Sequence, residues 1–238
     1  MSSEIRKEVI LERLDRDQRV SVLELSAEFG VSGETTRRDL KDLEAEGAAD
    51  TPITERIKLN ALEKDEVAGL ARSLINDDCV IFLDTGTTTL ALARRLVGFK
   101  KLRLYTNSLR IAQAACEHFG VHVQMTPGSM RPVEQDLVGY DTISYIQQFH
   151  FDMVFMGAGA INADYGFMDY EEDEARIRQV LLKQTSHSVM LSDHSKFGKV
   201  GNVITAPFAR VQTLVTDRRP PDTIARALEA EELEVIHG

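Results

Sequence analysis

Short apolar runs rich in β-forming residues alternate with amphipathic stretches from about residue 60 onward. The amphipathic stretches repeat with the period of a helix, whereas the runs have the length of buried strands. Strands that alternate with helices form a parallel sheet covered on both faces, so the sequence predicts an α/β fold with a Rossmann-like, parallel-rich domain. The runs are residues 79–83, 102–105, 121–125, 153–156, 188–191, 211–215 and 233–236, and helical stretches include 62–75, 90–97, 109–118 and 171–185.

The most specific polar motif, Asp84-Thr85-Gly86-Thr87-Thr88-Thr89, follows the first run and precedes a helix. Glycine permits a tight turn, and threonine hydroxyls together with the free N–H groups of a helix start favour an anion, typically phosphate. No Gly-Lys-Ser/Thr follows, so the motif is not a Walker loop. A capped turn that binds nothing is the alternative interpretation.

Polar residues follow four further runs in the same way, at Thr106-Asn107-Ser108, Thr126-Pro127-Gly128-Ser129, Gly157-Ala158-Gly159-Ala160 and Asp193-His194-Ser195-Lys196-Phe197. Ligands of open parallel sheets bind beyond the carboxyl ends of the strands, so we expect one site for a polyhydroxylated, anionic ligand. Lys196 could pair with a phosphate or with Asp84, or be a surface lysine. The predicted effector-binding residues are Asp84, Gly86, Thr87, Thr88, Thr89, Asn107, Ser108, Gly128, Gly157, Ala158, Glu174, Asp193 and Lys196.

Residues 20–47 have the pattern of two helices joined by a tight turn. Gly30 favours the end of the first helix, Val31 is expected to plug the space between the helices, and Ser32 is a good N-cap for the second. DNA-reading helices contact base edges and phosphates through their N-terminal residues. The predicted DNA contacts are Ser32, Glu34, Thr35, Thr36, Arg37, Arg38 and Lys41. The alternative is an ordinary helical hairpin with a solvated charged face.

The net charge of −10 argues against a general nucleic-acid binder. Basic residues cluster instead on the second helix of this hairpin and near the start of the chain. A local basic face of this kind can bind DNA, with weak and salt-sensitive nonspecific affinity. The N-terminal group, expected to contact phosphates, consists of Arg6, Lys7, Arg13, Arg16 and Arg19.

Two domains are expected. A helical period over residues 4–16 completes a three-helix unit that ends near Gly47, and residues 48–54 have the composition of a linker. We therefore assign residues 1–58 to a helix-turn-helix DNA-binding domain with its linker, and residues 59–238 to an α/β effector-binding domain. Residues 48–58 are the predicted transmission element between the two.

Both domains resemble one known family. Val31-Ser32, Thr36-Arg37-Arg38-Asp39-Leu40 and Leu43-Glu44 closely resemble the signature of the N-terminal winged helix-turn-helix of DeoR-family transcriptional regulators. Residues 63–217, with the five polar motifs, resemble the family's sensor domain, which is similar to ribose-5-phosphate isomerases and coenzyme A transferases. The resemblance implies a bacterial repressor, usually of sugar catabolism, which a phosphorylated sugar releases from its operator.

The sequence departs from the family pattern in three places. No basic His-Gly-Gly-Ala segment follows residue 47, so the wing is expected to be short or missing. Pro127-Gly128 stands where the family has Gly-Gly after the third strand. Gly159 and Asn162 replace both acids of the motif after the fourth strand, which changes the sugar hydroxyls that can be bound because a carboxylate accepts hydrogen bonds that glycine cannot.

Enzymes are the rival class. A sugar-phosphate isomerase-like enzyme needs a base beside a carbonyl, and the acids that serve in the similar isomerases are replaced here, although Glu174 could act. Gly157-Ala158-Gly159 begins like a dinucleotide fingerprint, but Asn162 stands in place of the third glycine. The histidines show no metal-ligand spacing. We expect no catalysis, cofactor or metal.

Cys79 and Cys116 lie in apolar contexts and are expected to be reduced core residues. No apolar run is long enough to span a bilayer, and the charged N-terminus does not resemble a secretory signal, so we expect a cytoplasmic protein without membrane contacts. A single small helix-turn-helix has limited specificity. The partners expected are therefore double-stranded operator DNA with two half-sites, a phosphorylated sugar, and further copies of the chain in a homodimer or homotetramer.

Overall fold

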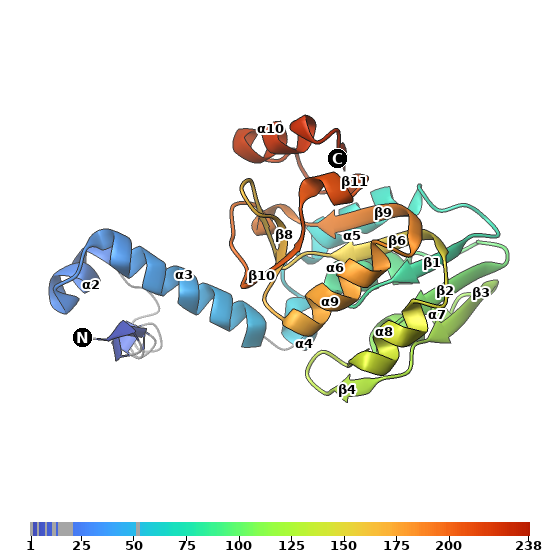
Figure 1. Cartoon of the computed structure of the whole chain (residues 1–238), viewed down its shortest axis with the longest axis horizontal. Helices are drawn as coiled ribbons and strands as arrows, with labels where there is room; N and C mark the ends of the chain where they lie inside the picture. The colour runs from blue at the N-terminus through green and yellow to red at the C-terminus, as the bar shows by residue number, and fades with distance from the viewer. Residues whose placement is uncertain (1, 4, 8, 11–12, 14–20, 51–52) are drawn as a thin grey trace. The chain divides into compact units, whose positions relative to one another are not determined.

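The computed structural model describes all residues except 1, 4, 8, 11–12, 14–20 and 51–52, and the side chains of residues 23, 41–42, 44–50 and 54–55 are likewise outside the described part. The chain divides into two compact units, Met1–Thr51 and Pro52–Gly238 (Figure 1). Residues 53–58, assigned from the sequence to the N-terminal domain, lie within the second unit. None of the helices in the described part is long and apolar enough to cross a membrane.

The N-terminal unit is helical wherever it forms regular structure in the described residues. Its two complete helices are α2 Val22–Phe29 and α3 Gly33–Asp50. Gly30 ends α2 in the left-handed conformation at φ 64°, and the Ser32 hydroxyl caps α3 by accepting a hydrogen bond of 3.1 Å from the Thr35 amide. The core contains Ile10, Leu25 and Phe29, with Val31, Leu40 and Leu43 packed against it. These features confirm the predicted helix-turn-helix.

The predicted linker is largely helical. α3 continues to Asp50, and α4 Ile53–Arg56 begins shortly after it. Ala48 and Ala49 are strong helix formers that carry α3 past Gly47. No strand occurs among the described residues of the N-terminal unit, so a β-wing is missing from that part of the chain.

A parallel sheet with strand order β12-β11-β9-β6-β1-β2-β3 forms the centre of the second unit. All neighbouring strands run in the same direction. Each of the predicted runs forms one of these strands, which confirms the α/β class. The strands are β1 Val80–Leu83, β2 Leu102–Thr106, β3 Val121–Met125, β6 Phe151–Gly157, β9 Thr185–Ser192, β11 Thr213–Thr216 and β12 Glu234–His237.

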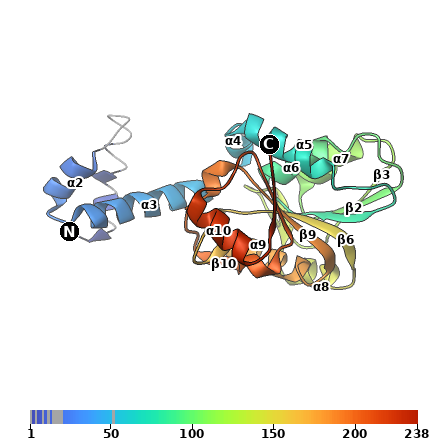
Figure 2. The ribbon, with the colours of Figure 1, turned by 90° about the horizontal axis from the view of Figure 1, so that it is seen from above.

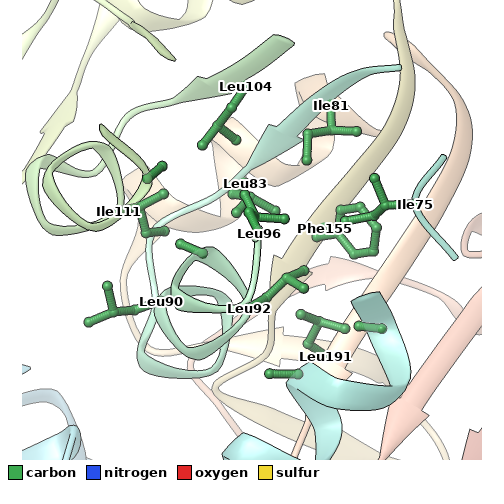
Figure 3. Close-up of a cluster of buried hydrophobic side chains, with 14 of the residues drawn as sticks. Ile75, Ile81, Leu83, Leu90, Leu92, Leu96, Leu104, Ile111, Phe155 and Leu191 are labelled. Atoms are coloured by element: carbon green, nitrogen blue, oxygen red, sulfur yellow. The ribbon is translucent and has the colours of Figure 1, made fainter. Parts of the chain in front are cut away.

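Helices cover both faces of this sheet (Figure 2). α5 Ala61–Arg72, α6 Thr87–Arg94 and α7 Leu109–Cys116 lie on one face, and α8 Tyr140–Ile146, α9 Glu172–Leu181 and α10 Asp222–Ala230 lie on the other. Each face has its own hydrophobic core. Figure 3 shows the first, in which Leu83, Leu104 and Phe155 of the sheet meet residues of α5 and α6. Ile57 packs against this core, which ties the residues after α4 to the second unit.

Shorter elements, which the sequence did not predict, lie between the main strands. β4 Ser129–Arg131 pairs with β5 Asp136–Val138, and β7 Ala160–Asn162, β8 Gly166–Asp169 and β10 Val203–Ala206 form an antiparallel sheet in the order β10-β8-β7. Strands of three or four residues are too short to show a period in sequence. One core prediction was wrong, because Cys116 at the end of α7 is exposed.

Candidate functional site

The polar motifs of the second unit lie along one edge of its parallel sheet. β3, β2, β1, β6 and β9 are consecutive neighbours in the parallel sheet, so their carboxyl ends share that edge. The five predicted motifs follow these five strands. This edge is where ligands of open α/β sheets bind.

The turn after β1 presents the start of α6. Gly86, at φ 151°, is the N-cap residue, and Thr87 begins the helix. The first turn of a helix leaves backbone N–H groups without intrahelical partners, so the amides of Thr87, Thr88 and Thr89 are suited to an anion. Asn107 from the next strand end holds this turn, because its Oδ1 accepts a hydrogen bond of 3.1 Å from the Thr85 amide.

A buried arginine, Arg178 of α9, organises the middle of the edge. Its side chain is only 3% exposed and forms ion pairs with Asp84 at 2.6 Å, with Glu174 at 3.0 Å and with Asp169. Asp169, at the end of β8, also accepts hydrogen bonds from the Thr205 hydroxyl and from the Gly159 amide. Three carboxyl groups, from the turn after β1, from β8 and from α9, therefore share one guanidinium group.

A second arginine extends this network to the β4–β5 hairpin. Arg131 pairs with Asp136 at 2.6 Å and with the other oxygen of Glu174 at 2.8 Å. The two arginines and four carboxyl groups would carry a net charge of −2 if every acid were ionised. The pKa of Asp84 is raised to about 7. Burial is the main cause and the negative charge of Glu174 adds to it, whereas Arg178 opposes the shift. Burial likewise raises the pKa of Asp169.

This raised pKa predicts a pH dependence of stability. Asp84 holds its proton more tightly folded than unfolded, so the native state binds more protons between about pH 4 and 7 and the free energy of unfolding contributed by this group falls as pH rises through that window. Between pH 5 and pH 8 the free energy of unfolding, measured by urea denaturation, should fall by about 1–2 kcal/mol more in the wild type than in Asp84→Asn. Equal losses in the two proteins would contradict the assignment.

Cationic groups lie beside the acidic network. The Lys64 ammonium donates hydrogen bonds to the carbonyls of Leu59 at 2.6 Å and Arg56 at 2.7 Å. Burial lowers its pKa to about 8, and the charges of Lys196 and Arg56 lower it further, while Asp193 opposes them. Burial also lowers the pKa of Lys196. Among the described residues the Lys196 ammonium has no ion-pair partner, so it is free to meet an anion.

Several buried oxygens at this edge have no hydrogen-bond partner among the described residues. They are Asp84 Oδ1, Thr85 Oγ1, Thr126 Oγ1 and Glu134 Oε2. Leaving a buried polar atom unpaired costs about 1–3 kcal/mol. Two carboxylate oxygens and two hydroxyls are the groups that would pair with the hydroxyls of a polyhydroxylated ligand.

Several other predicted site residues shape the backbone of this edge, and their side chains are buried, partly buried or absent. Asn107 and Ser108 are buried, and Ser108 caps α7 by accepting a bond from the Ile111 amide. A Cβ atom on Gly128, which has φ 149°, would lie 2.2 Å from the Thr142 hydroxyl oxygen, so this position accepts only glycine without rearrangement. Gly157 ends β6, Ala158 follows it, and both are partly buried.

The place of the missing acid at position 159 is partly taken by another residue. A Cβ atom on Gly159 would lie 3.2 Å from Asp169 Oδ1 and 3.1 Å from the Tyr170 ring. The Asp169 carboxyl group thus lies directly beside the point at which a side chain at position 159 would begin. Asp169, Arg178, Arg131, Asp136, Glu134, Arg56 and Lys64 were not predicted as site residues; Arg178 could have been suspected because it lies one turn after Glu174.

The N-terminal unit presents a polar face at the start of α3. Ser32, Glu34, Arg37 and Arg38 are exposed, and Thr35 is partly exposed. Glu34 and Arg37 are 3.7 Å apart, a long and exposed contact that leaves the guanidinium available. This face contains the residue types that contact phosphates and base edges.

Two predicted DNA contacts need correction. Thr36 is fully buried, and its hydroxyl lies 2.9 Å from the Ser26 hydroxyl, so it joins α2 to α3 instead of reaching DNA. Arg6 is also buried and pairs with Asp39 at 2.6 Å. Arg13 pairs with Glu28. Arg16, Arg19 and the side chain of Lys41 lie outside the described residues.

An open groove of about 610 Å³ lies at the opposite edge of the sheet, where residues 97–101 and 117–122 precede β2 and β3. Its lining includes Phe99 and Phe119, and it lies at the amino ends of β2 and β3, whereas the polar motifs follow the carboxyl ends of the strands. This groove is therefore separate from the edge that carries the five polar motifs.

Comparisons with known proteins agree with both units. Residues 6–50 match the DeoR-like helix-turn-helix domain, and residues 59–218 match the DeoR C terminal sensor domain. The chain is 32% identical to a putative aga operon transcriptional repressor of Escherichia coli O157:H7, covering 97% of this chain and 92% of the relative. It is 28% identical to the glycerol-3-phosphate regulon repressor of Escherichia coli K12, covering 95% of both chains.

Solved structures share the fold at low sequence identity. The crystal structure of eIF2B beta from Chaetomium thermophilum superposes with a TM-score of 0.51 at 13% identity, over 98% of this chain and 92% of the other. This similarity concerns the arrangement of helices and strands alone.

Proposed function

We propose that this chain, which belongs to the DeoR family of transcriptional regulators, is a repressor of carbohydrate metabolism genes. A phosphorylated sugar controls its binding to operator DNA. The repressor would act in the cytoplasm as a homodimer or homotetramer, because paired half-sites multiply the limited specificity of one small helix-turn-helix. The sugar would bind at the carboxyl edge of the sheet.

The effector proposal rests on two sets of groups that occur together at this edge. One set is suited to an anion, and the other consists of buried oxygens without hydrogen-bond partners. On one side, the Lys196 ammonium and the first turn of α6 offer donors to a dianionic phosphate. On the other, Asp84 Oδ1, Glu134 Oε2 and two threonine hydroxyls offer partners to sugar hydroxyls. A phosphorylated sugar satisfies both sets.

A thermal-shift comparison tests the effector proposal. Phosphorylated sugars that bind the native state raise the melting temperature by mass action, and the same sugars without phosphate should not. Thr87→Ala, in the first turn of α6, should reduce the shift without unfolding the protein. Asp84→Ala is a poor probe because it also removes a partner of Arg178. Equal shifts with phosphorylated and unphosphorylated sugars would contradict a phosphate site.

The DNA-binding proposal predicts a loss for one exposed arginine. Arg37→Ala should weaken operator binding by about 1–3 kcal/mol if the guanidinium reads a guanine, since a bidentate contact is lost. The measurement is fluorescence anisotropy with operator DNA obtained by in vitro selection. Lys183→Ala, in the second unit, is the control and should bind as the wild type does. Unchanged binding of Arg37→Ala would remove this residue from the reading face.

An isomerase-like activity is the alternative, and the site favours it less. Glu174, the base that the sequence offered, is held by both Arg178 and Arg131, and these arginines keep its pKa low despite burial. A general base works best with a pKa near the working pH. We therefore propose that the site binds its sugar without converting it.

A further inference from the structure

The segment that joins the two units along the chain runs across the proposed effector site. Residues 53–60, called the strap here, comprise α4 and the turn that leads into α5. Two residues separate Ile53 from Asp50, the last residue of α3. Ile53 is buried, and the strap belongs to the second unit. It is thus part of the sensor fold and also the chain's only covalent path to the DNA-binding unit.

The strap is fastened to both sides of the site by side chains. On one side, Arg56 pairs with Glu134 at the turn of the β4–β5 hairpin, at 3.1 Å. On the other, the Asn60 amide group donates a hydrogen bond of 3.0 Å to Asp193 Oδ1. The same Asp193 oxygen accepts a bond from the Ser195 amide and so shapes the turn that carries Lys196. The strap therefore contacts the two elements between which the ligand would lie.

A buried lysine holds the strap in this conformation. The Lys64 ammonium bonds the carbonyls of Arg56 and Leu59, which closes the turn from inside. Asn60 adopts a left-handed conformation at φ 51°, a geometry that the surrounding bonds maintain. The Arg56 side chain, which pairs with Glu134, is 27% exposed and is not enclosed as Ile53 is.

We infer that Arg56 reports effector binding to the strap by sharing its guanidinium group between Glu134 and the bound anion. Arg56 is close enough to Lys64 and Lys196 for its charge to lower the pKa of both, so an anion that meets Lys196 also attracts Arg56. Glu134 Oε2 has no hydrogen-bond partner among the described residues. Binding of the anion adds a contact between the site and the strap, and this contact restricts α4. That an anion binds here at all rests on the proposed function.

Hydrogen exchange in the full-length protein tests this inference, with inorganic phosphate and glycerol 3-phosphate as probes. The amides to follow are Ile57, bonded to the Ile53 carbonyl, and Lys64, bonded to the Asn60 carbonyl. Either probe should slow exchange at Ile57 about fivefold in the wild type, because restricting α4 suppresses its local opening. In Arg56→Gln the probe should still raise the melting temperature, whereas exchange at Ile57 should no longer respond. Arg56→Lys should restore part of the response.

The matched control is Arg95→Gln, which breaks an exposed arginine–aspartate pair between α6 and Asp65. It should behave as the wild type does. A probe that stabilises the wild type but leaves exchange at Ile57 unchanged, or that acts equally on Arg56→Gln, would overturn the inference and leave the proposed function intact. A wild type that neither probe stabilises would overturn the inference, whereas the proposed function fails only if phosphorylated sugars also leave the melting temperature unchanged.

Discussion

Replacing Arg178 with methionine should lower the free energy of unfolding of the second unit by about 3–5 kcal/mol, the range for breaking a buried ion pair. The side chain is 3% exposed and is the shared partner of Asp84, Asp169 and Glu174. Its loss leaves the carboxyl groups buried beside one another, so they must take up protons or draw in water. Urea denaturation near neutral pH measures the change.

Arg176→Met on the same helix is the matched control. Arg176 pairs with Glu172 one turn away, and both side chains are more than half exposed. Such surface pairs contribute about 0.3–0.5 kcal/mol. If Arg178→Met cost as little as Arg176→Met, Arg178 would not be the organising residue of the site. A destabilisation that disappears at pH 5 would show that the unpaired acids, and not lost packing, cause it.

Replacing Lys196 with methionine should have opposite effects on stability and on ligand binding. Burial lowers the pKa of this lysine, and no described side chain pairs with it, so its charge opposes folding of the free protein. Removing the charge should raise the free energy of unfolding by about 0.5–1 kcal/mol, as functional residues are often held at a cost to stability. Affinity for a phosphorylated sugar should fall about 10–100-fold, because a charge-assisted hydrogen bond is lost.

Isothermal titration and urea denaturation of the same preparation separate the two effects. Lys199→Met is the control, since Lys199 is exposed in the same loop. It should change neither quantity appreciably. A Lys196→Met protein that is less stable and binds the sugar normally would show a structural lysine.

The sequence identified the sheet and the helix-turn-helix because both depend on local patterns. Each strand of the main sheet carries an apolar run, and Gly30 and Ser32 mark the turn between α2 and α3. The parallel order then brings the motifs after β1, β2, β3, β6 and β9 to one edge. That the motifs meet at one edge follows from the parallel topology, which the alternation of strands with helices in the sequence predicts.

The charged network could not be predicted in the same way. Arg178 pairs with acids from the turn after β1, from β8 and from its own helix, and Asp84 is far from it in sequence. Such long-range pairs leave no local pattern. The same holds for Thr36 and Arg6, whose residue types suit DNA but whose side chains turn into the helical core. Composition indicates what a side chain can contact, and packing decides whether it does.

The most direct test of the account is the response of operator binding to a phosphorylated sugar. DNA fragments enriched by the purified protein supply the operator, and anisotropy titrations with and without each sugar supply the affinities. The account predicts that one phosphorylated sugar weakens operator binding at least tenfold, a coupling of about 1.4 kcal/mol, and that Thr87→Ala binds the operator normally but responds less, because its hydroxyl is lost while its backbone amide remains. Operator affinity that no phosphorylated sugar changes, although one binds at the sheet edge, would contradict it.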